Sequence, residues 1–434
     1  MSAVTRPNAS AVAERLDARF RERRAQVPVL AQRADAEGIA GIAAAGDMVP
    51  LLFPHTTYKS YPEPLVTKGR WDQMNRWLDS LSTHRVAGID LSGVADVDDW
   101  IERLEQSGRL VSSSSGTSGK SSFLNKTIRD RRASLDDLVR CLTDLGLAPE
   151  RRWHVIPVGP ETGISHHTAV RDMINTAYGR PDGITAPEGA AAPAKHHAYM
   201  TGLATMRRAM AEGTASPDEV AAFEAEAARR QAQVEQRLAY FADGVIDRRD
   251  EPLFFNATFP LLYRLCELLR DHGVSDGDIT GENALTTGGG LKGIALPDDY
   301  QAQIFRLLNI APERFLHYYS MQELNVRMPK CLSGRYHVPA ELELFVLVKE
   351  GEALAPVSDG RVEGRAAFFD ATVDGRWGGT ISGDKVIADF GTCPCGKAGP
   401  TILDEITRYS DLPDGDKITC AGTLDAYVRG FIEA

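Results

Sequence analysis

The chain has 434 residues, of which 43% are hydrophobic and 25% charged, so it can bury one large core or two ordinary ones. No run approaches the roughly 18 apolar residues of a membrane span, and the first residues lack the apolar core of a secretory signal. The formal net charge of -11 argues against broad attraction to nucleic-acid phosphates, so we expect a cytoplasmic protein with no membrane span and no nucleic-acid partner.

Local patterns predict several elements in the first half of the chain. Apolar spacing is helix-like over 9–26 and 71–81, and the aromatic and proline-rich stretch between them is typical of an ordered loop. A further helix is predicted over 135–145 and a short buried strand over 152–158. The low-complexity segment 180–195 predicts a surface excursion or a mobile flap. The first hundred residues show no recognisable chemistry.

The second half of the chain predicts an α/β core. A long helix is expected after Ser216, because Ser216 can cap free N–H groups, Pro217 suits the first turn and Glu219 can bond back to the cap. From Pro252 onward, strand-like and helix-like runs alternate. Between 341 and 390, three runs are typical of consecutive strands separated by turns.

Residues 112–122 form a loop of serines and glycines with one cation, Lys120. Its hydroxyls, glycine N–H groups and ammonium are the groups that a polyphosphate needs. The tripeptide GKS at 119–121 invites comparison with the nucleoside-triphosphate P-loop, but Ser114 replaces that motif's first glycine and only residues 110–111 precede it as an apolar strand. Taken alone, the loop is equally compatible with a flexible linker.

Four segments, in this order, resemble the motifs of the adenylate-forming enzymes, in the branch of phenylacetate-CoA ligase and the acyl-protein synthetases of bacterial bioluminescence. The segments are the serine loop, TTGGGLKG at 286–293, YSMQE at 319–323 and SGD at 382–384. The resemblance implies an α/β fold, the large N-terminal domain of these enzymes with layered sheets and helices. It also implies that a carboxylic acid and MgATP give an acyl-adenylate, which is then transferred to a thiol of CoA, a carrier protein or the enzyme itself.

The resemblance also implies a role for each motif. Tyr319 would stack on adenine, Glu323 would coordinate the Mg²⁺ that bridges the phosphates, and Asp384 would accept hydrogen bonds from the ribose. Lys120 would steady the departing phosphates, which is positioning rather than covalent chemistry. The remaining nucleotide-binding residues that we expect are Ser115, Gly116, Thr117, Ser118, Gly119, Gly288, Gly289, Gly290, Gln322 and Arg408. Gln322 departs from the family pattern, which has a threonine touching the α-phosphate.

A cluster of cysteines and one histidine predicts a metal site. The candidate ligands are Cys331, His337, Cys393 and Cys395. Three sulfurs and one imidazole suit tetrahedral Zn²⁺. The phenylacetate-CoA ligase branch has a similar C-x-x-x-G-x-H segment and a later C-P-C-G, so the resemblance implies a structural zinc with all four positions filled by protein. Buried free cysteines and a surface histidine are the alternative.

The end of the chain differs from the family pattern. The hinge-like segment 406–411 precedes only the short tail 412–434, so we expect the mobile lysine-bearing C-terminal domain to be absent or strongly truncated. Bioluminescence acyl-protein synthetases carry their acyl group on a cysteine near the C-terminus, which implies that Cys420 accepts it as a thioester. Thiolate attack is favourable because AMP leaves as a stable anion. A small buried residue in a final strand is the alternative.

The expected organisation has three parts: an N-terminal helical and loop part of the large domain (1–110), an adenylation core with the nucleotide and zinc sites (111–411), and the tail (412–434). Candidates for the acid-binding site are His166, His167 and Lys292. A neutral imidazole can donate to a carboxylate, although a solvated histidine pair at a helix start is the commoner arrangement.

Two rival functions stay open. The departure at Gln322 and the short tail are compatible with a weakened relative that binds nucleotide or serves as a scaffold. An adenylating enzyme with an amine or nitrite as acceptor is the other rival. The partners that we expect are a small carboxylic acid, CoA and an acyl-carrier or acyl-acceptor protein, and an oligomer is compatible with the sequence.

Overall fold

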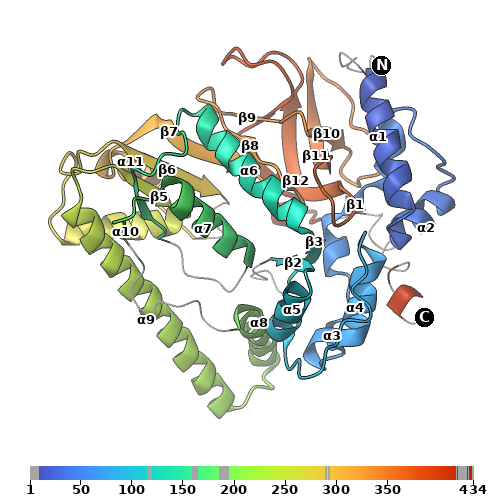
Figure 1. Ribbon diagram of the computed structural model, residues 1–434, viewed down its shortest axis with the longest axis horizontal. Helices are drawn as coiled ribbons and strands as arrows, with labels where there is room; N and C mark the ends of the chain where they lie inside the picture. Colours follow the sequence, from blue (N-terminus) through green and yellow to red (C-terminus); the bar gives the residue numbers. More distant parts are fainter. Residues whose placement is uncertain are drawn as a thin grey trace. The chain divides into compact units, whose positions relative to one another are not determined.

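The computed structural model describes residues 9–114, 120–158, 165–184, 195–288, 291, 294–416, 418, 428 and 430–432 (Figure 1). By packing, the chain divides into two compact units. Unit 1 comprises Met1–Ser134 and Met321–Ala434, and unit 2 comprises Leu135–Ser320. Within the described ranges, no helix combines the length and apolar character that crossing a bilayer requires. The two units are a division by packing, whereas the three parts expected from the sequence follow the order of the motifs.

The first part of unit 1 consists mainly of helices. The helices are α1 (Ala9–Arg24), α2 (Pro28–Ala36), α3 (Glu63–Thr67), α4 (Trp71–Ser80) and α5 (Val97–Gln106). The first and fourth confirm the helices predicted over 9–26 and 71–81. The ordered loop predicted between them contains the 3-10 turns η1 (Ala45–Leu51) and η2 (His55–Lys59) on either side of the two-residue strand β1 (Phe53–Pro54).

The serine loop lies between two strands rather than between a strand and a helix. Strand β2 (Leu110–Ser113) pairs in antiparallel fashion with β3 (Phe123–Lys126). In the nucleoside-triphosphate P-loop a strand runs through the loop directly into a helix, so this hairpin is a different architecture. Helix α6 (Ile128–Asp144) follows β3 and starts earlier than the helix predicted over 135–145.

The second part of unit 1 is dominated by an antiparallel sheet. Its strands run in the order β10, β11, β12, β13, β9. The bounds are β8 (Met328–Pro329, outside this sheet), β9 (Arg335–His337), β10 (Leu342–Leu347), β11 (Arg361–Asp370), β12 (Gly379–Asp389), β13 (Thr401–Leu403) and β14 (Thr407–Arg408). Strands β10, β11 and β12 lie side by side (Figure 1) and confirm the three predicted strands. Strands β1 and β14 also pair with β12.

Unit 2 is built around four parallel strands in chain order. They are β4 (His154–Ile156), β5 (Leu253–Asn256), β6 (Asn283–Gly288) and β7 (Ile310–Tyr319). Its helices are α7 (Ser165–Tyr178), α8 (His196–Glu212), α9 (Pro217–Asp247), α10 (Phe259–Asp271) and α11 (Tyr300–Leu307). Buried residues alternate between two cores: Phe255 and Leu285 pack with α9, α10 and α11, and Phe254 and Ala284 pack with α6 and α7. This confirms the α/β core predicted from the alternation of elements.

The start of α9 confirms the predicted cap. The Ser216 hydroxyl accepts from the backbone N–H of Glu219 at 3.3 Å, and the Glu219 carboxylate accepts from the backbone N–H of Ser216 at 2.8 Å. Pro217 occupies the first turn, where its missing N–H costs nothing. The reciprocal bonds satisfy two N–H groups that a helix start otherwise leaves unpaired.

Candidate functional site

The loop that carries Glu323 is attached to the strand that enters the serine loop. The side-chain amide of Gln322 donates to the carbonyl of Ser113, the last residue of β2. Across the hairpin, the N–H of Ser122 donates to the Ser114 hydroxyl at 2.8 Å, and the N–H of Ser114 donates to the Ser122 carbonyl at 3.1 Å. Two motifs that are far apart in the sequence are therefore tied together in unit 1.

Lys120 lies near the end of the serine loop and packs against an aromatic ring. Its ammonium sits 4.0 Å from the centre of the Tyr61 ring and also donates to the Tyr61 carbonyl. A cation over a tyrosine face is stabilised by the quadrupole of the ring. The neighbouring loop residues lie outside the described part of the chain: Ser115, Gly116, Thr117, Ser118 and Gly119. Lys120 is thus placed at the base of the candidate phosphate loop.

The charge of Glu323 affects two residues of segment 55–59, in which the sequence showed no recognisable chemistry. Burial lowers the pKa of both His55 and Lys59, and the nearby Glu323 carboxylate acts against this shift in both. The segment arrives there because β1 pairs in parallel with β12, with Phe53 opposite Thr380. No local motif marks such a pairing, so only the fold could reveal that His55 and Lys59 lie close enough to Glu323 for its charge to affect their pKa values.

The SGD segment is a bulge in β12. Arg365 on β11 is opposite Lys385, but Ala367 is opposite Ile381, so 382–384 protrude from the ladder. The hydroxyl of Ser382 donates to the Ala366 carbonyl at 2.8 Å and accepts from the N–H of Asp384 at 3.1 Å. Bulges of this kind re-aim side chains.

The bulge brings Asp384 next to a second predicted nucleotide residue. Asp384 is opposite Arg408 in the pairing of β12 with β14, and Arg408 Nε lies 3.9 Å from Asp384 Oδ1. Their side-chain exposures are 15% and 72%, respectively. The partly buried Asp384 carboxylate is a suitable acceptor for a sugar hydroxyl. The exposed Arg408 guanidinium beside it is a suitable partner for a phosphate.

Gly383 leaves room for two side chains from distant segments. A Cβ at this position would lie 3.2 Å from His55 Cε1 and 3.3 Å from Asp416 Oδ2. The same two side chains approach each other, with His55 Nε2 3.9 Å from Asp416 Oδ2. The glycine of the SGD motif therefore permits close packing of the N-terminal segment and the tail against the bulge.

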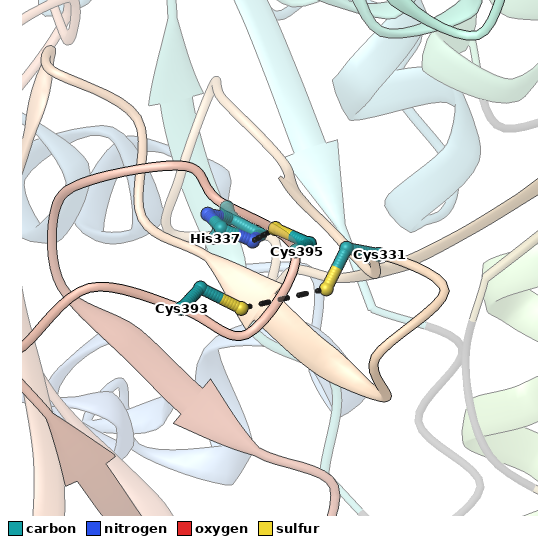
Figure 2. Close-up of side chains that lie close together, drawn as sticks. All are labelled: Cys331, His337, Cys393 and Cys395. Carbon is teal, nitrogen blue, oxygen red and sulfur yellow. Dashed lines mark hydrogen bonds between the residues drawn. The ribbon is translucent and has the colours of Figure 1, made fainter.

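The four predicted metal ligands meet in unit 1 (Figure 2). One ligand atom from each of them lies within 4.8 Å of all the others: Cys331, His337, Cys393 and Cys395. Cys331 Sγ is 3.8 Å from Cys393 Sγ, and Cys395 Sγ is 3.3 Å from His337 Nε2. Such a compact group of three sulfurs and one imidazole fits tetrahedral zinc.

Two tight turns shape this group. The Gly334 N–H donates to the Cys331 carbonyl at 2.9 Å, and the Gly396 N–H donates to the Cys393 carbonyl at 2.8 Å. Both glycines have a positive φ, +75° and +88°, which other residues adopt only with strain. Although burial acts to raise the pKa of the Cys331 thiol, backbone N–H donors bring it below its usual value. Burial lowers the pKa of His337. Burial raises the pKa of the Cys393 thiol to about 11, so the shifts of Cys331 and His337 favour the thiolate and the neutral imidazole that bind metal, and that of Cys393 does not.

In unit 2, Gly288 ends β6 beneath an aromatic ring. It is opposite Tyr318 in the sheet, and a Cβ at Gly288 would lie 2.6 Å from that ring. Tyr319 is the last residue of β7 and is half-buried. The other predicted residues of the glycine turn, Gly289, Gly290 and Lys292, lie outside the described part of the chain, as does Cys420 in the tail.

His166 and His167 begin α7, with ring centres 6.3 Å apart. A second pair, His196 and His197, begins α8, with ring centres 5.2 Å apart. Burial, together with the nearby His196 and His167, lowers the pKa of His197 to about 4. Sequence reasoning missed this second pair, although its signal was the same histidine doublet at a helix start.

Comparison with known proteins identifies the fold. No protein-family model matches the chain, and a search of curated proteins finds no match. Two crystal structures of 2-hydroxyisobutyryl-CoA ligase in complex with 2-HIB-AMP and CoA are similar, each at 14% identity and 93% coverage of this chain. The open conformation matches with a TM-score of 0.51 over 75% of its chain, and the thioesterification state with 0.53 over 69%. This chain has the fold of the adenylate-forming enzymes.

The adenylate-forming fold confirms the fold class predicted from the four motifs. Within unit 1, the structure brings together the Gln322 and Ser113 segments, and separately Asp384 with Arg408. It also assembles the complete cysteine and histidine group. The residues that sequence reasoning missed in unit 1, His55 and Lys59, come from a segment that the long-range pairing of β1 carries into place.

Proposed function

We propose that the chain uses MgATP to activate a carboxylic acid as an acyl-adenylate, which a thiol then attacks. The observation that carries the proposal is the hydrogen bond from Gln322 to Ser113, which holds the Glu323 loop against the stem of the serine loop. An adenylation site needs a carboxylate for the metal close to a loop that holds phosphates. A flexible serine-rich linker would not require such a hydrogen bond between its stem and a distant segment.

The residues of unit 1 divide the work by their chemistry. Lys120 would hold the β- and γ-phosphates, Asp384 the ribose hydroxyls, and Arg408 the nucleotide charge. Glu323 would hold Mg²⁺, which supplies positive charge to the phosphates as pyrophosphate leaves. In the same proposal, Tyr319 stacks on adenine, and the glycine turn that begins at Gly288 borders it.

The cysteine and histidine group would hold a structural Zn²⁺. The four ligand atoms are close enough for one ion, and both cysteine turns have the glycine that their geometry needs. With four protein ligands the ion would have no open position, so its contribution is to stability rather than to the reaction. It would join the segment after Glu323 to the segment after Asp384.

For the second half-reaction, CoA, a carrier protein or Cys420 would supply the thiol. The similar ligase structures are described with CoA and an adenylate of a small acid, and this supports CoA as the first acceptor to test. His166, His167 and Lys292 remain the proposed acid-binding residues. A cytoplasmic location, the phenylacetate-CoA ligase or acyl-protein synthetase branch, and the core at 111–411 belong to the same proposal.

A second candidate function has one observation in its favour. The amide group of Gln322, which would replace the family threonine at the α-phosphate, donates to Ser113 instead. Its carbonyl oxygen is buried without a hydrogen-bond partner among the described residues, and an acceptor oxygen repels phosphate. A nucleotide-binding scaffold with little or no adenylation activity would tolerate this arrangement.

Carboxylate-dependent exchange of pyrophosphate into ATP, across a panel of acids, tests the proposed function. We expect exchange with at least one acid, and a loss of about a hundredfold or more in Glu323→Gln, because the carboxylate that would hold Mg²⁺ is removed, and with it the positive charge that the ion would supply to the phosphates. Glu341→Gln is the matched control, since Glu341 is exposed in the turn before β10. Binding of ATP without exchange for any acid would favour the scaffold.

A further inference from the structure

Arg365 on β11 is a fully buried arginine that belongs to none of the sequence motifs. Its Nε donates to the Lys349 carbonyl at 2.7 Å, Nη1 to the Ser382 carbonyl at 3.0 Å and Nη2 to Asp416 Oδ1 at 2.7 Å. The guanidinium also lies over the Tyr409 ring, 4.1 Å from its centre. One side chain thus contacts four segments of unit 1.

The contact with Ser382 supports the bulge that carries Asp384. Arg365 is the last residue of β11 in register before the bulge begins. Residues that protrude from a sheet lose their ladder hydrogen bonds, and a buried carbonyl without a donor is costly. Arg365 supplies a charged donor to the Ser382 carbonyl, which is stronger than a neutral one. It therefore fixes the backbone two residues before Asp384.

A second contact supports the strand that carries Arg408. Tyr409 follows Arg408 directly, and its ring is held by the face of the Arg365 guanidinium. Asp384 and Arg408 are opposite each other in the pairing of β12 with β14. Arg365 thus contacts a residue close to each of them in the chain: Ser382, two residues before Asp384, and Tyr409, directly after Arg408.

The third contact provides the counter-charge. A buried guanidinium is tolerated only when it is paired and its N–H groups are bonded. Asp416 is the acid that pairs with Arg365, and its own exposure is 20%. Because Asp416 also lies against Gly383, the ion pair between Arg365 and Asp416 packs against the bulge.

We propose that Arg365, with Asp416 as its counter-ion, is a positioning residue that sets the distance between Asp384 and Arg408 for nucleotide binding. The inference rests on the proposed function, because it assigns these two residues to the nucleotide. Arg365 is buried behind the bulge and acts through Ser382 and Tyr409. Its loss should therefore weaken ATP binding and leave the acid unaffected.

Three variants test the proposal: Arg365→Lys, Asp416→Ala and the control Arg361→Lys. Arg361 lies on the same strand and is also near an acid, with its Nε 3.7 Å from Asp389 Oδ2. Its side chain is 50% exposed, whereas that of Arg365 is buried. The measurements are the ATP dissociation constant by calorimetry, KM for ATP and for the acid in pyrophosphate exchange, and the melting temperature. A lysine cannot reproduce the forked contacts of arginine.

We expect Arg365→Lys to raise the dissociation constant and KM for ATP by about tenfold or more, since hydrogen bonds to a charged group are lost. Asp416→Ala should raise both by about threefold on the same grounds. KM for the acid should stay within about twofold in both variants, and Arg361→Lys should match the wild type.

A folded Arg365→Lys that binds ATP like the wild type overturns the inference, and so does an equal rise in both KM values. If Arg365→Lys does not fold, Asp416→Ala decides in the same way, because its side chain reaches the surface. Wild-type protein that binds ATP but exchanges no pyrophosphate contradicts the proposed function alone. The dissociation constants then still test the positioning role. Wild-type protein that does not bind ATP overturns both.

Discussion

Lys126, the last residue of β3, is a buried lysine close to several charged groups of unit 1. Its ammonium donates to Asn325 Oδ1 at 3.2 Å. Burial and the nearby Arg376 lower the pKa of Lys126, the Asp130 carboxylate acts in the opposite direction, and the result is a pKa of about 8. Asp130 in turn accepts the N–H groups of Thr127 and Gly375 at 2.8 and 2.9 Å. The Lys126 charge is therefore tolerated in a network whose other members are fixed by the backbone.

This pKa predicts that stability depends on pH. An unfolded lysine keeps its proton up to about 10.5, whereas Lys126 releases it near 8 on folding. The unfolded state thus binds more protons between these values, and stability should rise with pH through this window. Between about pH 7.5 and 9.5, the wild type should gain about 2 kcal/mol relative to Lys126→Met. Urea unfolding at the two pH values measures this difference.

The comparison between the two proteins isolates the titration of Lys126. Other groups titrate in the same window, and they do so equally in both proteins. The packing change caused by methionine is independent of pH. Parallel stability curves for wild type and Lys126→Met would show that Lys126 keeps its proton in the folded protein.

At the scale of elements, the start of α9 depends on the Ser216 cap. Ser216→Ala removes the acceptor for the Glu219 N–H, and we expect the first turns to lose about 1 kcal/mol of protection. Hydrogen exchange at 217–223 is the suitable measurement, because the end of a helix can open without global unfolding. Ser216→Asp keeps an acceptor and should exchange like the wild type. Equal exchange in the alanine variant would mean that the cap contributes nothing.

A second element-scale prediction concerns the metal that would join β9 to the turn after β12. Dialysed protein should hold about one zinc per chain, and Cys395→Ser should hold much less, because a three-ligand site binds zinc more weakly. Cys141→Ala is the control, since Cys141 is buried in the core of unit 2. Active protein with almost no metal would reject the zinc site.

The helices and strands differ in how far apart in the sequence the residues that determine them lie. The α9 start was predictable because its cap, its proline and its acidic partner all lie within four residues. The pairing of β1 with β12 was not predictable, because two residues near the N-terminus meet a strand far along the chain. For the same reason, no local signal placed His55 beside Gly383.

On the scale of the whole molecule, the two packing units do not follow the order of the motifs. Unit 1 is made of two stretches of chain that come before and after unit 2. The serine loop precedes unit 2 and Glu323 follows it, and yet Gln322 and Ser113 are hydrogen-bonded within unit 1. Motif order indicated which segments belong to one function, and contacts across the chain showed which side chains meet.

By itself, the sequence determined the α/β class, the serine loop, the SGD motif and the four candidate zinc ligands. These features depend on residue type and on spacing over a few positions, which a linear pattern preserves. Only the tertiary structure decided that Arg365 holds both Ser382 and Tyr409, and that His55 and Lys59 stand near Glu323. Those contacts arise from strand pairing and burial between distant segments, and neither leaves a local trace in the chain.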